Sequence, residues 1–326
     1  MYVDRTKIMR QHIDKLNGGI DAATISEDIE SCIDEIMSLT EEIDLANDFI
    51  KMDGLGLISR MLKHEGHRFR AYAGEILAIL TQNNEYAQKR VLEFGLGKYL
   101  FDTLDKETDP HAMKGLLHGT SCFVRGNKDC LKLFLEGDCF SSVLCMMERA
   151  SNMLQGKSYL VNSENDAILR LLNKAAFFIY CLSQDITDDF IPTLQSSGCV
   201  EKMAKLAFVS TSYHGGAAEF LLPALLLLLS GRSQLQSAIA FARSDDLSSN
   251  NSEVSDPKLL IKRTPLIFSI PVPVSSIRSQ CPKDAPTPQE LIDWLNHLLV
   301  EIKRNSIEDQ EANETIDSLI QILSKK

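Results

Sequence analysis

Two short stretches contain residue types that could hold a metal ion or a phosphate group. His64–His67 (HEGH) is similar to part of a zinc-binding helix, but that motif needs its histidines four residues apart on one helix face. Gly156–Ser158 (GKS) matches the end of a phosphate-binding loop, but the position five residues before Gly156, which must be glycine, is Ser151. We therefore expect no metal, no cofactor and no catalytic residues, and we expect that the chain is not an enzyme.

Four glycines instead mark a repeat along the chain. Gly54, Gly95 and Gly137 are separated by 41 and 42 residues, and Gly198 follows after 61, so that the third interval is longer by about one inserted loop. A period near 40 residues made of amphipathic helices is typical of armadillo and HEAT arrays, in which each unit buries its apolar face against the next. We predict an all-α, armadillo/HEAT-like right-handed solenoid of about four repeats, with helical caps at both ends.

Composition divides the chain into four parts. We expect a helix after Ser26. The helix Phe69–Leu80 contains small residues that let neighbouring helices approach closely. The inserted loop that lengthens the third glycine interval falls at 156–166. Seven of the ten prolines lie between 257 and 288. The predicted parts are an N-terminal helical cap (1–45), the armadillo-like repeats (46–243), a flexible polar and Pro-rich insert (244–288) and C-terminal helices (289–326).

Charge and cysteine usage restrict the class of partner and the compartment. The net charge of −11 argues against nucleic-acid binding, which needs clustered lysine and arginine. The segment from Arg60 to Lys132, however, contains twelve Lys/Arg and nine Asp/Glu. This slight excess of positive charge indicates either an ordinary solvated face or a surface complementary to an acidic partner. The eight cysteines form no C-x-x-C pair, and the longest apolar run, Phe220–Leu229, is about half of a membrane span. We expect a cytoplasmic protein without a membrane anchor.

Polar residues recur at the ends of the predicted helices on the same period. Because the third helices of stacked repeats line the concave face, we expect some of these side chains to point into one groove. Asparagine and glutamine at such places also cap helices or bridge neighbouring repeats through hydrogen bonds, and the sequence leaves both roles open. The candidates are Asn47, Gln82, Asn83, Asn84, Arg125 and Lys174.

Three segments together resemble a known family. They are IDLANDFIKMDGLGLI (43–58), RFRAYAGEILAILTQNNEYAQKRVLEFG (68–95) and MKGLLHGTSCFVR (113–125), and Lys174–Phe178 looks like the corresponding helix of the next unit. Their order and spacing resemble the armadillo-type nucleotide exchange factors of heat shock protein 70, the heat-shock-protein-70-binding protein, Fes and Sil family. The resemblance extends from about residue 30 to residue 232.

The resemblance implies a co-chaperone. Its concave face would bind lobe II of the ATPase domain of heat shock protein 70 and favour an open arrangement of the lobes, so that ADP leaves; a monomer is expected. The family contact positions correspond to Ala46, where a small side chain permits close approach, and to Asn47, Gln82–Asn84, Arg125 and Lys174. The alternative is an armadillo adaptor that binds an extended peptide or another protein and is unrelated to chaperones.

One departure from the family concerns the helix that starts at Pro110. Where the relatives read V-R-x-K-A, this chain has His111–Gly115 (HAMKG), which removes one basic residue and places a glycine inside a helix. Glycine at such a position costs about 1 kcal/mol relative to alanine.

Overall fold

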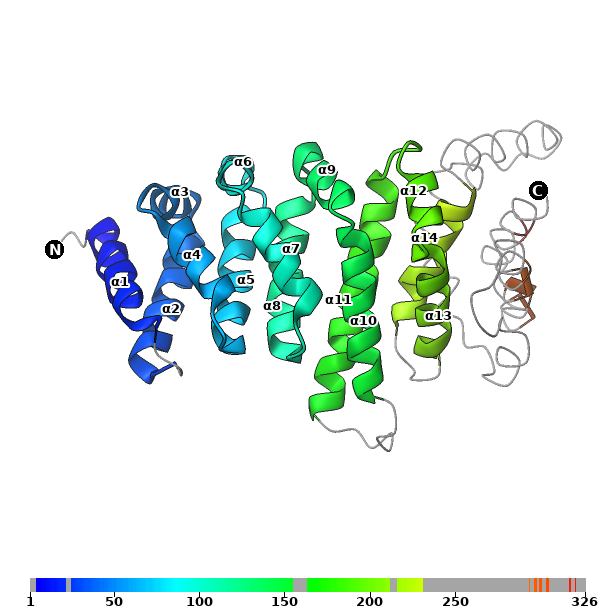
Figure 1. Ribbon diagram of the computed structural model, residues 1–326, viewed down its shortest axis with the longest axis horizontal. Helices are drawn as coiled ribbons and strands as arrows, with labels where there is room; N and C mark the ends of the chain where they lie inside the picture. The colour runs from blue at the N-terminus through cyan, green and yellow to red at the C-terminus, as the bar shows by residue number, and fades with distance from the viewer. Residues whose placement is uncertain are drawn as a thin grey trace. The chain divides into compact units, whose positions relative to one another are not determined.

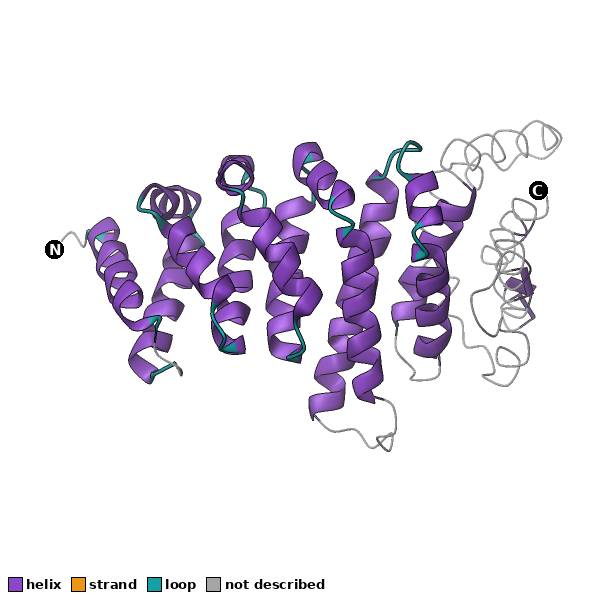
Figure 2. Cartoon of the chain, viewed as in Figure 1, coloured by secondary structure: helices purple, strands orange, loops and turns teal. Residues whose placement is uncertain are grey.

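The computed structural model describes residues 4–21, 25–154, 163–211 and 216–230, and scattered residues between 293 and 320. All regular secondary structure among these residues is α-helical (Figure 2). The chain forms two compact units, residues 1–150 and 151–326. The predicted insert (244–288), most of the predicted C-terminal helices (289–326) and residues 156–162 of the predicted extra loop (156–166) lie outside the described residues, and the last four residues of that loop are already helical.

The first unit begins with two helices and continues with sets of one short helix and two further helices. Ser26 caps the second helix as expected, because its Oγ accepts a hydrogen bond from the backbone N–H of Ile29 at 3.3 Å. The helix before it, α1, lies inside the predicted N-terminal helical cap (1–45). The helices are α1 (Arg5–Gly19), α2 (Glu27–Thr40), α3 (Ile43–Lys51), α4 (Gly54–Lys63), α5 (His67–Thr81), α6 (Glu85–Phe94), α7 (Leu96–Lys106), α8 (Pro110–Val124), α9 (Lys128–Glu136) and α10 (Cys139–Leu154).

Within this unit the helices form two layers and an edge (Figure 1). The third helices α5 and α8 pack side by side together with α2, and α1, α4 and α7 form the second layer. The short helices α3, α6 and α9 lie along one edge, across the ends of both layers. The interior between the layers is apolar: Phe49, Phe69 and Phe123 are each at most 1% exposed. Burial of this kind of side chain contributes roughly 1.5–3 kcal/mol each.

The glycine period marks the junction between the first and second helix of each set. A left-handed residue connects α3 to α4 (Asp53, φ 66°), α6 to α7 (Gly95, φ 76°) and α9 to α10 (Asp138, φ 53°). Two of these residues are aspartates that directly adjoin the glycines Gly54 and Gly137. The repeat was therefore predicted correctly, although the residue with positive φ is the neighbouring aspartate in two repeats.

The helix expected to start at Pro110 ends before Asn127. The helix ends at Val124, and Gly126 adopts φ 76°. Asn127 instead caps α9, since its Oδ1 accepts from the N–H groups of Asp129 at 3.1 Å and Cys130 at 3.2 Å. A left-handed glycine commonly ends a helix and an asparagine commonly caps the next one, so this pair of residues favours the end of α8 and the start of α9.

The described helices of the second unit repeat the same order. α13 and α14 pack against each other, and α14 also packs on α11, where the ring of Phe220 lies 5.3 Å from that of Phe177. The Leu-rich segment is a core helix as predicted: Leu221 and Leu225 are 0% exposed. In the described part of the chain, none of the helices is long and apolar enough to cross a membrane. The helices are α11 (Ser163–Asp185), α12 (Ile191–Ser196), α13 (Cys199–Thr211) and α14 (Ala217–Ser230).

Candidate partner-binding surface

The exposed side chains of α2, α5 and α8 form the surface that we call the third-helix face. Its geometry depends on glycines between α5 and α8. A Cβ on Gly74 would lie 2.2 Å from the carbonyl oxygen of Gly115, and a Cβ on Gly119 would lie 2.6 Å from the carbonyl oxygen of Gly74. Real Cβ atoms do not approach backbone this closely. Without side chains at these positions the two helices pack backbone to backbone, and their outer side chains lie side by side on one face.

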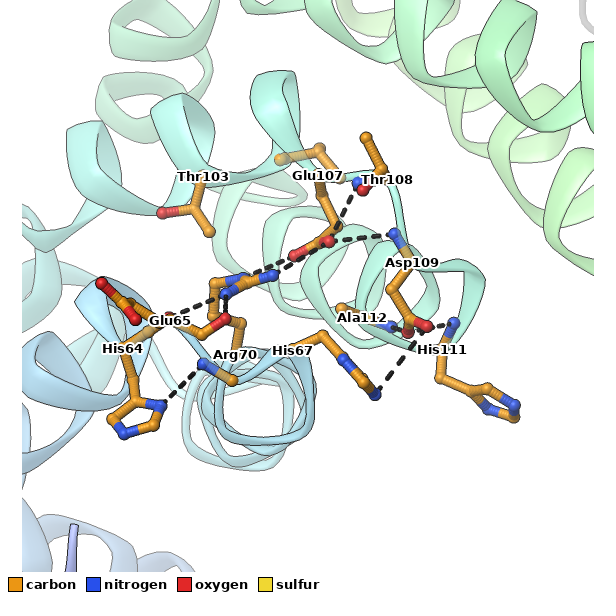
Figure 3. A network of polar contacts seen from close by, with 12 residues as sticks. His64, Glu65, His67, Arg70, Thr103, Glu107, Thr108, Asp109, His111 and Ala112 are labelled. Atoms are coloured by element: carbon orange, nitrogen blue, oxygen red, sulfur yellow. Dashed lines mark hydrogen bonds and ion pairs between the residues drawn. The ribbon is translucent and has the colours of Figure 1, made fainter. Parts of the chain in front are cut away.

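A buried ion pair fixes the start of these helices (Figure 3). Arg70 of α5 donates to both carboxylate oxygens of Glu107, at 2.6 and 3.1 Å, and also to the carbonyl oxygens of His64 and Glu65. The Glu107 side chain is 1% exposed, and it also accepts from the N–H groups of Thr108 and Asp109. Burial raises the pKa of this carboxyl, but Arg70 and the two N–H groups outweigh burial and hold the pKa below 4.5. The network ties the loop before α5 to the loop before α8.

At one side of the third-helix face, α2 and α5 share a polar cluster. Arg68 donates to the carboxylate of Glu30, and the hydroxyl of Tyr72 donates to the same carboxylate at 2.5 Å. The bond from Tyr72, and then Arg68, lowers the pKa of Glu30. Burial and the charge of Glu30 raise the pKa of Tyr72 to about 12. Glu30 is therefore an anion and Tyr72 a neutral donor at neutral pH.

The same arrangement recurs one repeat later between α5 and α8. His118 lies 43 residues after Glu75, and its Nδ1 is 2.7 Å from the Glu75 carboxylate; Lys114 approaches the same carboxylate at 3.8 Å. The hydrogen bond to Cys122, and then the bond to Glu75, raise the pKa of His118 to about 9. Its imidazole therefore carries a positive charge at neutral pH.

Three of the predicted site residues have structural roles. Ala46 is 2% exposed inside α3, so its side chain does not reach the surface. Asn84 is 6% exposed and caps α6, with its Oδ1 accepting from the N–H of Ala87. Its Nδ2 donates to Oδ1 of Asn47 at 3.1 Å, which joins α6 to α3. The asparagines therefore tie neighbouring repeats, which was one of the two roles that the sequence left open.

Three other predicted residues are exposed at the ends of third helices. Gln82 and Arg125 are the C-terminal caps of α5 and α8, 43 residues apart. Asn83 follows Gln82 in the left-handed conformation with φ 54°. The structure thus brings Asn47 and residues 82–84 together at one end of α5 and places Arg125 at the matching end of α8.

The side chains that join neighbouring repeats through hydrogen bonds form what we call the seam, and it includes Asn47 and Asn84. The sequence interpretation missed two further members. Gln88 donates from Nε2 to the carbonyl oxygens of Cys122 and Arg125, both at 3.0 Å, and Asn127 donates to Oε1 of Gln88 at 3.3 Å. Asn127 lies 43 residues after Asn84, so an alignment of the repeats against each other would have identified it.

Lys174 lies in the second unit, on α11. Its side chain is exposed, between Asn173 and the buried pair Ala175 and Ala176. Lys174 follows Lys114 of α8 by 60 residues, close to the 61-residue interval between Gly137 and Gly198.

The two histidines with partial resemblance to a zinc motif have other contacts. Nδ1 of His64 accepts from the N–H of Gly66 at 2.8 Å, and Nε2 of His67 lies 3.9 Å from the carboxylate of Asp109 (Figure 3). Among the described residues, no group of three or more histidine, cysteine, aspartate or glutamate side chains is arranged to hold a metal ion.

Comparison with known sequences identifies chaperone-binding relatives. No family model matches the chain. It is 27% identical over 153 residues to Hsp70-binding protein 1 of Mus musculus and 26% identical over 153 residues to Hsp70-binding protein 1 of Homo sapiens. Each match covers 47% of this chain and 43% of the relative, so the chain spans less than half the length of the curated relatives it matches.

Comparison with solved structures addresses the fold. A designed armadillo repeat protein has a TM-score of 0.50 at 12% identity, with 97% of this chain and 99% of that chain covered. An engineered protein has a TM-score of 0.51 at 14% identity, covering 97% and 96% of the two chains. The resemblance predicted from the sequence is confirmed: this chain is an armadillo-like helical repeat protein whose curated homologues are Hsp70-binding proteins.

Proposed function

We propose that the chain binds the ATPase domain of an Hsp70 chaperone and promotes release of ADP from it. The observation that carries the proposal is its similarity to Hsp70-binding protein 1, together with the armadillo-like fold. The protein would act as a monomer in the cytoplasm and would need no cofactor and no catalytic residue of its own. Repeat proteins of this kind serve as rigid binding scaffolds.

Exchange would follow from thermodynamic linkage. The third-helix face would bind lobe II when the lobes of the ATPase domain are apart, and ADP would bind best when they are closed. A partner that prefers the open arrangement lowers nucleotide affinity, and nucleotide must lower partner affinity by the same factor. Couplings of this kind are about 1–3 kcal/mol, or roughly 5–150-fold in affinity.

The contact residues of the proposal are the exposed ones. Gln82, Asn83 and Arg125 in the first unit and Lys174 in the second have side chains that can reach a partner. Ala46 and Asn84 are buried, and they would act by keeping α3 and α6 in place. A bulky charged residue at position 46 is not a clean test of docking, because a charge placed in the core would cost on the order of several kcal/mol of folding free energy.

The alternative function, an adaptor for an extended peptide, needs amide side chains that are available to a peptide backbone. The described amides of the seam, Asn47, Asn84, Gln88 and Asn127, bond to one another and to backbone groups of neighbouring helices. Opening these bonds would cost about 1 kcal/mol each, since a buried donor would lose its partner. This pairing leaves Gln82 and Asn83, among the predicted amides, for a peptide backbone, and the similarity to Hsp70-binding protein 1 is what favours the chaperone-binding proposal.

Calorimetric titration of the full chain into an Hsp70 ATPase domain tests the proposal. We expect binding to the nucleotide-free domain and an affinity that falls by roughly 5–150-fold with saturating ADP. The variant Arg125→Ala/Lys174→Ala is expected to bind at least tenfold more weakly. The matched control Lys98→Ala/Lys106→Ala removes two exposed lysines of α7 and is expected to bind like the unmodified chain. No binding, or an affinity that ADP leaves unchanged, would refute the proposal.

A further inference from the structure

The third-helix face changes sign from one helix to the next. α2 carries five carboxylates and no lysine or arginine. α5 carries Arg68 and Glu75, with Arg70 paired to the buried Glu107, and α8 carries one lysine, two histidines and no carboxylate. These helices are neighbours in one layer of one compact unit, so the change of sign occurs across a single surface.

At the acidic side, the carboxylates lie on the surface. Glu27, Asp28, Asp34 and Glu35 are exposed, and Glu30 is half-buried. Only Glu30 has its charge balanced from α5, by Arg68. Asp34 lies close enough to Tyr72 to raise the pKa of its hydroxyl, which places that carboxylate at the border with α5. A partner that covers this border would therefore meet negative charge on its α2 side.

On α8, which forms the basic side of the face, two cationic side chains share one acidic neighbour. The side chains of Lys114 and His118 are 54% and 43% exposed, and both lie near the single carboxylate of Glu75. Arg125 is exposed at the end of the same helix. Because the pKa of His118 is raised to about 9, this side carries more positive than negative charge at neutral pH.

We infer that the third-helix face binds the Hsp70 ATPase domain in one orientation, with acidic side chains of that domain against α8 and basic side chains against α2. The inference rests on the proposed function and adds what selects the orientation of the partner. Complementary charge on both sides speeds association and fixes the docking register, whereas a reversed partner would place like charges together.

Charge-reversal variants on both sides test the inference. Lys114→Glu lowers the formal net charge of −11 by two, and Asp34→Lys raises it by two. We expect both to weaken binding of the full chain to the ATPase domain by roughly tenfold, mainly through slower association at low salt. If only net charge mattered, the two variants would change the affinity in opposite directions, and that result would overturn the inference.

Matched controls and milder variants separate the possible failures. Lys98→Glu and Asp102→Lys make the same charge changes at exposed positions of α7, in the other layer, and are expected to have little effect. Lys114→Gln and Asp34→Asn are expected to give smaller losses in the same direction and replace either reversal that fails to fold. If Lys114→Glu and Asp34→Lys change the affinity as little as the α7 controls do, the inferred docking orientation is wrong and the proposed function still stands. Absence of binding by the unmodified chain would overturn the proposed function and this inference with it.

Discussion

Gly115 of α8 lies against Ala71 of α5, and a Cβ at position 115 would stand 2.3 Å from the Ala71 carbonyl oxygen. From the sequence alone, this glycine only lowers the stability of its helix relative to alanine and departs from the family pattern. The structure gives its reason: the backbone of the neighbouring helix occupies the space of a side chain.

Gly115→Ala is therefore expected to destabilise the protein by about 2 kcal/mol or more, although alanine is the better helix former by about 1 kcal/mol. Urea unfolding followed by circular dichroism measures the change. Gly18→Ala in α1 is the matched control, because a Cβ there meets nothing within 4 Å, and it is expected to be neutral or stabilising. A stabilising effect at position 115 would contradict the close packing of α5 on α8.

Arg70→Met tests the buried ion pair. It leaves the Glu107 carboxylate in the interior without its cation, which is expected to cost about 3–5 kcal/mol at pH 7. The folded-state pKa of Glu107 lies below its ordinary value of 4.5, so the pair stabilises the protein above about pH 4.5, and this stabilisation is lost as the pH falls through the folded-state pKa. The difference between the unfolding free energies of the unmodified protein and of Arg70→Met should become smaller below pH 4.5. A gap that is constant from pH 7 to pH 3 would exclude this role of Glu107.

His118 is expected to titrate near pH 9, because its imidazolium bonds to Cys122 and Glu75. A pKa raised in the folded state means that the stabilisation is fully present below the unfolded value of about 6.5 and is lost as the pH rises through about 9. Proton–carbon NMR of the imidazole ring gives this pKa directly. Glu75→Gln should shift it downward. An ordinary pKa in the unmodified chain, or one that Glu75→Gln leaves in place, would contradict the observed contact.

Two adjacent asparagines are expected to respond differently to substitution. Asn84→Ala removes the α6 cap and the bond to Asn47, and should cost about 1–2 kcal/mol. Asn83→Gly places glycine at an exposed position with φ 54° and should be neutral or slightly stabilising. Thermal unfolding of both variants measures the contrast. Equal losses would show that residue 84 does not tie the repeats.

The repeat and its helices could be predicted because they depend on local signals. Ser26 and Asn84 are capping residues followed by apolar positions at helical spacing, and Asn127 carries the same signal, although it was not recognised from the sequence. The glycine period identified each junction between first and second helices, but it could not show that Asp53 takes the left-handed conformation in place of Gly54, because aspartate and glycine both tolerate it.

The surface was harder to predict because it depends on contacts between repeats. Alanine and asparagine occur both in cores and at surfaces, so only packing shows that Ala46 and Asn84 are buried. The pair of Glu75 and His118 joins residues 43 positions apart, and its separation by one repeat is visible only when the units are aligned with one another.

The central claim is tested most directly by the rate at which a fluorescent ADP analogue leaves an Hsp70 chaperone, with and without the full chain. The account predicts an acceleration that saturates as more of the chain is added. It should be lost in Arg125→Ala/Lys174→Ala and retained in Lys98→Ala/Lys106→Ala, with the helical content of both variants unchanged. A release rate that the folded, unmodified chain leaves unaltered at saturating concentration would contradict the claim that it is an exchange factor.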